Sequence, residues 1–495
     1  MFRHRRHSPS VQRRRGKILV LVVLLLPVLF ATMLLVFDGS RVTVESRSLQ
    51  HMADAAALVA ADELYRAVST STAITAAEAN FLTNDDLANG AVQVNIPPTS
   101  GEFAGSSRHA EVIISRPLDN YFGGIFQLAD DTPLSVRAVA GIEPATDGAA
   151  IVVLDEDPPP LKLLQALPIV PSLPTLIAGF EILGLGRVTI DGAVLVNNTW
   201  GGEDELGLPA GQSMGPPYAV ACTPILPLSK LQATDLRVAG GVDRRQNYRG
   251  FDGDYSTVLR AGSRPVPDPL REVPPPTASV DPANIVDDYY GGQTIVGLPL
   301  IGPPVVLKPG VYEWINIVTG NVVFEPGVYV IRSKSPLTQL SLTMLAANVQ
   351  AQGVMFYITD NNSYSVNSPG VDATDGDTHP GNVGALELLP STVINIGILG
   401  SSYSPLNSPG SPYDGMMIYQ RRHDRRPIVL VQENLLGPGT ISGTLYSKWG
   451  HLLLAGKGTF DTRIVTGTLR IIALLDVDIA PTWKLDPAFE VYLVE

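Results

Sequence analysis

The hydrophobic pattern divides the chain close to its beginning. A leader over 1–17 carries seven Lys and Arg and no acidic residue, and it runs into an uncharged apolar span, Ile18–Phe37. The span has the roughly 20 residues that an α-helix needs to cross a bilayer core. Pro27 lies inside it, and membrane helices tolerate proline better than soluble helices do. We therefore predict one transmembrane helix over 18–37, with membrane lipid around it.

A cleaved signal peptide is the alternative to this anchor. The apolar region of a signal peptide is ~7–15 residues long and ends at small residues, whereas this span is longer and ends at Phe37 and Asp38. The positive leader is expected to remain in the cytoplasm, so that everything after the span is exported. The prediction is a single-pass protein whose bulk is extracytoplasmic.

After the span, the pattern predicts a long helix followed by a small sheet. Between 41 and 68, apolar residues fall at steps of three and four on one helix face; they include Leu49, Met52, Ala53, Ala56, Ala60 and Leu64. Strand-like segments follow at 91–96, 109–115 and 134–142. We predict a pilin-like α+β module over 38–147, with this face packed on its own sheet. The alternative is that the alanines of this face let the backbone of another chain segment approach the helix closely.

The region 148–495 is a succession of short Val, Ile, Leu and Tyr runs between Gly, Pro and Asn. The phrase Pro-Gly-Val-Tyr occurs at 309–312 and again at 326–329, and looser echoes follow. Such self-similarity predicts a large irregular β-helix, or β-solenoid, in which each coil buries the apolar face of its neighbour. A β-sandwich is the alternative, since its strands would recur every 8–12 residues. The predicted fold class is therefore mainly β.

Two Pro-rich segments interrupt this region, at 155–174 and 263–276. Both favour extended polyproline conformation. The first is expected to join domains, and the second to be a long loop that crosses the solenoid surface, because strand patterns resume on both sides of it.

The charge distribution excludes one class of partner. Outside the leader, 28 Lys and Arg stand against 48 Asp and Glu, a net charge of −20. Nucleic acid is therefore not expected as a partner, because phosphate backbones are bound by clustered Lys and Arg. The chain has no Cys-x-x-Cys, no His-x-x-x-His, no phosphate loop and no Gly-x-Ser-x-Gly. We expect no cofactor and no transition metal.

Two loops carry candidate binding chemistry. Asp372, Asp375 and Asp377 crowd one loop and are a weak candidate Ca²⁺ site, although Asp and Gly are also favoured in a solvated turn. Arg421, Arg422, Arg425 and Arg426 form a basic segment that is a candidate site for an anionic glycan or an acidic protein face. The alternative there is a solvated loop.

The N-terminal residues resemble a known family. Arg15–Ile18, Asp38–Arg41 and the run from Gln50 to Ala60 are similar to the N-terminus of TadG-like proteins of the Flp (tight adherence) pilus system. The motif residues are Gln50, Ala53, Asp54, Ala55, Ala56 and Ala57. The resemblance is close over about 12–65 and weaker to 143, and 148–495 resembles the β-helical region of some of these proteins. It implies a bacterial inner-membrane envelope protein with protein partners in pilus or fibre assembly.

The sequence departs from relatives of this kind at two places. Prepilin processing favours Gly followed by Glu at the fifth position, and Leu21 stands at that position after Gly16. Many relatives carry an Asp-x-Ser-x-Ser metal site, but Asp155-Glu156-Asp157 lacks both serines. We predict no such processing and no such metal site.

The sequence thus favours a non-catalytic, membrane-anchored envelope protein associated with Flp-type pilus assembly or surface adhesion. A membrane-tethered carbohydrate-active enzyme, a polysaccharide lyase or hydrolase, is the alternative. Clustered carboxylates beside exposed aromatic residues would favour the enzyme; the aromatic candidates are Trp200, Trp314, Trp449 and Trp483.

Overall fold

The structure is a computed structural model that describes residues 17–66, 69–84, 90–120, 131–159, 161–163, 175–223, 230–254, 257–276, 289–298, 301–359, 379–380, 386–397, 400–432 and 439–494. The chain forms two compact units. Unit 1 comprises residues 1–143 and 489–495, and unit 2 comprises 144–488. The sequence predicted a domain boundary between residues 147 and 148 and assigned everything after it to the solenoid. In the structure the boundary lies between 143 and 144, and residues 489–495 belong to unit 1.

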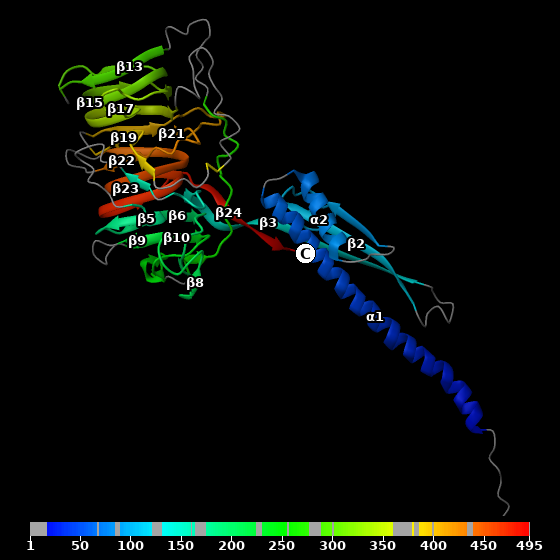
Figure 1. The fold of residues 1–495 in the computed structure, drawn as a ribbon. Helices are drawn as coiled ribbons and strands as arrows, with labels where there is room; N and C mark the ends of the chain where they lie inside the picture. Colours follow the sequence, from blue (N-terminus) through cyan, green and yellow to red (C-terminus); the bar gives the residue numbers. More distant parts are fainter. Residues whose placement is uncertain are drawn as a thin grey trace, which may run out of the picture. The chain divides into compact units, whose positions relative to one another are not determined.

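Unit 1 is built around one long helix (Figure 1). α1 (Lys17–Tyr65) is followed by α2 (Thr70–Asn84), which the sequence pattern did not reveal. The sheet consists of β1 (Ala91–Asn95), β2 (His109–Asp119) and the first part of β3 (Asp131–Val153), in antiparallel order β1–β2–β3. These strands confirm the predicted α+β module. The amide of Val494, just after β24 (Leu485–Leu493), bonds to the Val139 carbonyl of β3.

The C-terminal half of α1 lies on this sheet. Leu49, Ala53, Ala56 and Ala60 are completely buried against a sheet face that includes Val112. Alanine on the helix lets the strands approach closely and buries apolar area with little loss of side-chain entropy. The alanine face is therefore used within the chain's own module, as favoured from the sequence.

The opposite face of this sheet buries a carboxylate. Glu111 of β2 is inaccessible to solvent, pairs with Arg137 Nε at 2.6 Å, and accepts hydrogen bonds from Thr99, Ser100 and Asn95. Burial opposes ionisation of Glu111, but the hydrogen bonds from Thr99, Arg137 and Asn95 outweigh it and lower its pKa to about 2.

We expect Glu111→Gln to destabilise unit 1 at neutral pH. A carboxyl whose pKa is lowered on folding stabilises the fold above its unfolded pKa of 4.5 and loses that contribution as pH falls toward 2. The shift corresponds to about 3 kcal/mol at pH 7. Hydrogen-exchange protection of β1 and β2 measures it, and Glu78→Gln on the exposed face of α2 is the control. Equal protection in both variants would contradict the assignment.

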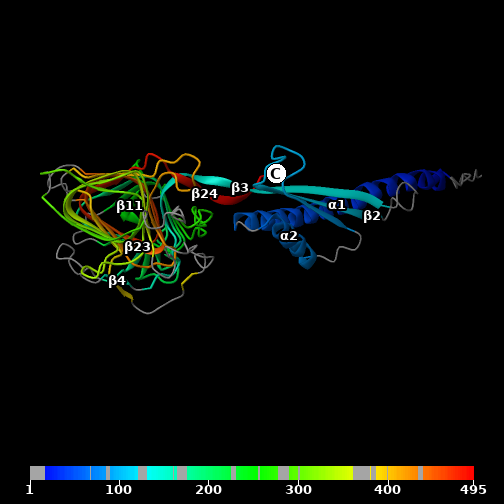
Figure 2. The ribbon, with the colours of Figure 1, turned by 90° about the horizontal axis from the view of Figure 1, so that it is seen from above.

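Unit 2 is a parallel β-helix, as Figure 2 shows from one end of the stack. Its longer strands are β5 (Ala178–Gly184), β6 (Val188–Val196), β9 (Tyr218–Thr223), β10 (Leu231–Val238), β13 (Tyr289–Val296), β15 (Gly310–Phe324), β16 (Gly327–Ile331), β17 (Leu342–Ile358), β21 (Met416–Gln420), β22 (Ile428–Gln432) and β23 (Thr440–Ile479). Shorter strands are β4 (Leu161–Leu163), β7 (Gly202–Glu203), β8 (Pro209–Ala210), β11 (Tyr248–Arg249), β12 (Leu259–Ala261), β14 (Val305–Leu307), β18 (Leu386–Leu388), β19 (Thr392–Asn395) and β20 (Ser402–Pro405), with a 3₁₀ turn at Arg245–Asn247. Among these strands only β7 and β8 pair antiparallel, which excludes a β-sandwich.

The coils are not stacked in sequence order. The chain enters at β3, winds outward through β6 and β10 to β12, and resumes at β13, which pairs with β15. It then winds back through β17 and β22 to β23, whose late residues pair with β3, β5 and β6. Ile464 thus lies beside Ile151, so the last coil closes on the first.

The repeated phrase supplies interior tyrosines. Tyr312 and Tyr329 are buried, and their ring centroids lie 5.9 Å apart. Tyr312 donates its hydroxyl hydrogen bond to the Lys308 carbonyl, and Tyr329 donates to those of Leu307 and Glu325. Each tyrosine therefore fills the core with its ring and satisfies corner carbonyls with its hydroxyl.

Candidate functional site

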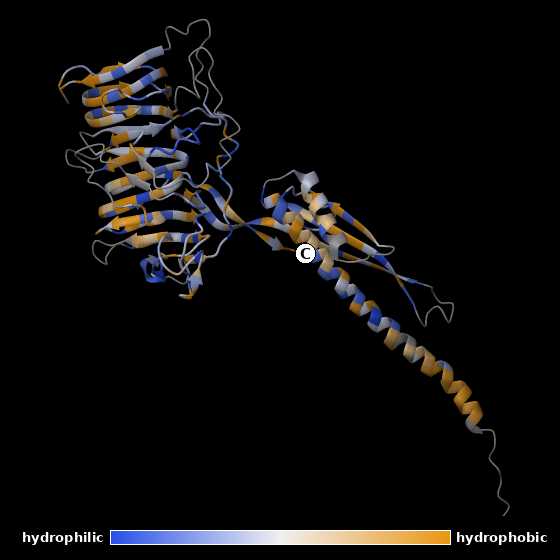
Figure 3. Cartoon of the chain, viewed as in Figure 1, coloured by the Kyte–Doolittle hydropathy of each residue, from blue (hydrophilic) through white to orange (hydrophobic). Residues whose placement is uncertain are grey.

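The first half of α1 is a candidate membrane span. One helix among the described residues is long and apolar enough to cross a membrane, and its most apolar window has a mean hydropathy of 3.1 with no residue buried in the protein. The exposed apolar side chains run from Leu19 to Phe37, with Pro27 inside the continuous helix. Figure 3 shows this half of α1 as a hydrophobic stretch. The helix includes Ile18, as predicted, and ends at Tyr65.

The predicted motif lies where α1 meets the sheet. Gln50 donates one hydrogen bond to the Asp54 carboxylate at 2.7 Å and another to the Arg137 carbonyl of β3 at 3.1 Å. Ala53, Ala56 and Ala57 are buried, whereas Ala55 is exposed. Two further contacts hold the helix to the sheet: Arg116 pairs with Glu45 at 2.8 Å, and Arg41 donates to the Asp119 carbonyl. The motif thus specifies helix–sheet packing.

Residues 16–63 match the family model described as "Putative Flp pilus-assembly TadE/G-like". The N-terminal segment is TadE/G-like. The match begins just before the apolar half of α1 and ends within the half that packs on the sheet, so it covers the helix and the Gln50–Asp54 motif. Nothing among curated proteins or solved structures matches the chain. The family finding confirms the resemblance over residues 16–63.

The basic segment at 421–426 is largely engaged in internal contacts. Arg422 is 6% exposed and donates to the carbonyls of Leu270, Arg271 and Val273 and to the Tyr446 hydroxyl. Arg426 pairs with Asp424 at 2.7 Å and also donates to Ser341. These contacts give both arginines a structural role, and neither is assigned to a binding site.

The partners of Arg422 belong to the second Pro-rich segment. We call residues 263–276 the strap, because they follow one outer face of the β-helix across several coils. Val266 exchanges two hydrogen bonds with Asn197, Asp268 accepts from Tyr446, and the Pro275 carbonyl accepts from Tyr413. Val266, Leu270 and Val273 pack on a buried apolar cluster of that face. The strap carries the chain from β12 toward β13, as the sequence suggested for this loop.

Arg425 belongs to a different group of side chains. Its guanidinium lies 3.9 Å from Asp155, which also pairs with His379 at 2.9 Å. Burial raises the pKa of Asp155, and the His379 contact opposes the rise. The His379 ring meets Trp449 edge-on. Asp155 begins the segment Asp155-Glu156-Asp157, and among the described residues no group of three His, Cys, Asp or Glu could hold a metal ion. Asp372, Asp375 and Asp377 lie outside the described residues.

The four tryptophans differ sharply in exposure. Trp200 is buried and donates to Asp157 at 2.7 Å, and Trp314 and Trp449 are half-buried. Trp483, which follows β23, is 77% exposed. Its indole is therefore the tryptophan surface most available for contact with another molecule.

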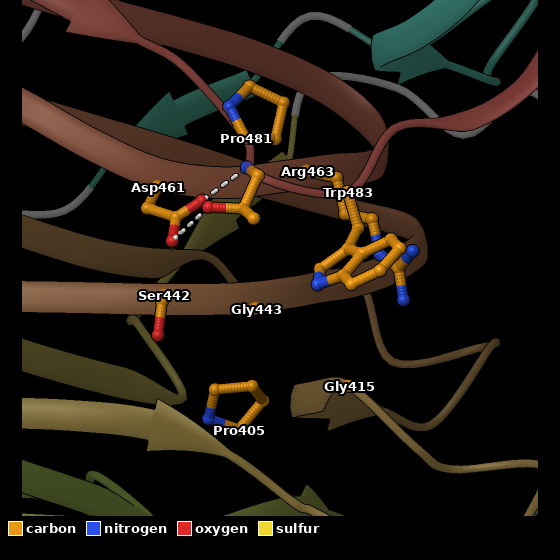
Figure 4. A pocket seen from close by; sticks show the side chains of 9 residues that line it. Pro405, Gly415, Ser442, Gly443, Asp461, Arg463, Pro481 and Trp483 are labelled. Carbon is orange, nitrogen blue, oxygen red and sulfur yellow. Dashed lines mark hydrogen bonds between the residues drawn. The ribbon is translucent and has the colours of Figure 1, made fainter. Parts of the chain in front are cut away.

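Trp483 borders a pocket of about 180 Å³ on the side of the β-helix (Figure 4). Pro405, Gly415, Gly443, Asp461 and Arg463 from neighbouring coils line it. Gly415 is at φ +76°, and a Cβ there would lie 2.9 Å from an Arg463 terminal nitrogen. A glycine at this position therefore lets the arginine reach the pocket wall.

The pocket combines apolar surface with a few fixed polar groups. Asp461 accepts hydrogen bonds from the amide and hydroxyl of Thr482, which fixes the turn that carries Trp483. Arg463 donates to the Thr444 hydroxyl. Burial lowers the pKa of Arg463, and the nearby Asp414 carboxylate opposes this. Sequence reasoning singled out Trp483 but none of its neighbours, because coils of unequal length bring them together.

Proposed function

We propose that the protein is a single-pass envelope protein of Flp-type pilus assembly, with its leader in the cytoplasm and the chain after Phe37, including the sheet of unit 1 and all of unit 2, outside it. The observation that carries the proposal is the TadE/G-like match over 16–63, which coincides with the helix that has one lipid-compatible half and one half packed on a sheet. The seven Lys and Arg of the leader, next to the apolar span, support this orientation.

Protease shaving of spheroplasts, with tags at both ends of the chain, tests the topology. We expect the C-terminal tag to be removed from intact spheroplasts and the N-terminal tag to be removed only after lysis. Recovery of the full-length chain as a soluble cytosolic protein, or a mature N-terminus beyond Phe37, would overturn the proposal.

Deletion of the gene tests the link to pili. Loss of assembled fibres is expected, and restoration by the full-length chain is the control. Intact fibres together with poor surface attachment would instead identify an adhesin without a role in assembly.

We further propose that the β-helix is a non-catalytic spacer and adhesive surface that contacts a neutral glycan at the Trp483 pocket. An exposed indole offers a flat apolar face to a pyranose ring, and the adjacent polar groups can bond its hydroxyls. The pocket is smaller than the ~300 Å³ at which pockets for drug-sized ligands begin, which suits a single ring. Its lining includes one carboxylate, Asp461, whereas most glycosidases need two. This favours binding over hydrolysis.

Trp483→Ala is expected to weaken glycan binding about 5- to 150-fold, if a stacked sugar ring gains the roughly 1–3 kcal/mol that a nucleobase gains on an aromatic side chain. A glycan array followed by calorimetry on the full-length chain in detergent measures this. Phe251→Ala, at an exposed aromatic residue outside the pocket, is the matched control. Unchanged glycan binding in Trp483→Ala would contradict the assignment, and release of shortened sugar chains would favour the enzyme.

A further inference from the structure

Three basic side chains from separate coils gather around a second pocket of unit 2. Arg187 immediately precedes β6, Lys230 immediately precedes β10, and Arg249 ends β11. All three line one cavity of about 290 Å³, together with Gln232, Gly250 and Gly253. We call this cavity the basic pocket. The three cations are far apart in the sequence, so no local charge pattern predicts that they lie together.

The strand register explains why these residues meet. Leu231 of β10 is paired with Val188 of β6 on one side and with Tyr248 of β11 on the other. Arg187 and Lys230 therefore occupy equivalent positions on adjacent coils. Gln232 is paired directly with Arg249. Since neighbouring strands lie ~4.8 Å apart, the stack holds three positive charges within a few strand spacings.

No direct ion pair holds these charges within the described part of the protein. None of the three side chains forms an ion pair or a hydrogen bond with another described residue. Two carboxylates lie nearby but have other partners. Asp476 accepts a bond from the Arg187 backbone amide, and Asp252 accepts from the Asp254 amide and the Thr257 hydroxyl. Neither carboxylate lines the basic pocket.

We propose that the basic pocket binds a phosphate group, either as free phosphate or as the headgroup of a lipid. Three cations that face one pocket without direct ion pairs repel one another, and an anion between them relieves that repulsion. Phosphate carries up to two charges near neutral pH and offers several oxygens to cationic and amide donors. The chain outside the leader has a net charge of −20, so most of its surface repels anions. Three cations around one pocket therefore make this pocket the exception.

Thermal unfolding of the full-length chain in phosphatidylcholine nanodiscs tests the proposal. Inorganic phosphate should raise the melting temperature along a saturable curve, and chloride at matched ionic strength should not. In a second arm, nanodiscs containing phosphatidic acid test the headgroup as the source. A response to inorganic phosphate assigns free phosphate, and a response in the second arm alone assigns the headgroup. No phosphate-specific response in either arm would overturn the proposal.

The double variant Arg187→Gln, Arg249→Gln should weaken phosphate binding at least about tenfold, because charge-assisted hydrogen bonds are about twice as strong as neutral ones. Both side chains are exposed, so the melting temperature without phosphate should be unchanged, which shows that the variant folds. Arg271→Gln, an exposed arginine of the strap, is the control. Equal phosphate affinity in the double variant and the wild type would exclude this pocket as the site.

Discussion

Arg422→Ala is expected to lower the free energy of unfolding of the β-helix by about 3–5 kcal/mol, since it deprives the buried Tyr446 hydroxyl and three half-buried carbonyls of their donor at once. The guanidinium is 6% exposed and holds three strap carbonyls together with the Tyr446 hydroxyl, with donor–acceptor distances of 2.8–3.1 Å. Thermal unfolding of the full-length chain and protease sensitivity of the strap measure the effect.

A matched change on the strap separates this effect from a general loss of charge. Arg271 has an exposed side chain paired with exposed Glu272, and Arg271→Ala should change stability by less than about 0.5 kcal/mol. Arg422→Lys should recover only part of the loss, because a single ammonium cannot reproduce the fork of an arginine. If Arg422→Ala unfolds at the wild-type temperature and its strap resists protease, the strap does not depend on this residue.

Breaking the ion pair between Glu181 and Arg470 is expected to be about as damaging. Arg470 of β23 donates to Glu181 of β5 at 2.6 and 2.9 Å, and both side chains are at most 2% exposed. Glu181→Leu would leave a buried guanidinium without its carboxylate, at a cost of about 3–5 kcal/mol. The pair joins the last coil to the first, so the loss should appear as earlier unfolding of the whole β-helix.

The double variant Glu181→Leu, Arg470→Met tests whether the uncompensated charge is the cause. It removes both charges from the same place and should recover most of the stability lost in the single variant. Asp191→Ala, which breaks an exposed pair with Lys484, is the control and should change little. A double variant as unstable as Glu181→Leu would indicate that packing, rather than charge, is responsible.

The sequence was most informative where a structural signal is local. Twenty uncharged residues after a basic leader predict the apolar half of α1, and the Leu49–Ala60 spacing identifies the face that packs on the sheet. α2 escaped prediction because most of its apolar residues are alanines and its large apolar residues are only Ile74, Phe81 and Leu82.

The β-helix was predictable as a class but not in its register. Gly310 is paired with Tyr329, so the two copies of Pro-Gly-Val-Tyr lie on adjacent strands without being aligned. Val311 is paired with Val330, Ile315 with Leu342, and Leu342 with Thr392, so coil lengths differ more than twofold. Coils of such unequal length give the sequence no fixed repeat period. The local sequence pattern also does not indicate that the chain enters the stack in its middle.

The candidate sites show the same limit. The sequence identified Trp483 as a candidate aromatic contact but gave the greatest weight among basic residues to 421–426. Arg422 there is held inside by the strap, whereas the basic pocket draws Arg187, Lys230 and Arg249 from three coils. Side chains that converge through coil stacking can be found only when the register is known.

The position of unit 2 within the chain has a mechanical consequence. Its first and last residues lie side by side: the Ala488 amide bonds to the Thr146 hydroxyl, and Gly148 approaches Lys484. Tension applied to the chain through unit 1 would therefore pass across the joined ends, leaving the stacked coils outside the path of the force. A protein exposed to shear could in this way be pulled repeatedly without being unwound.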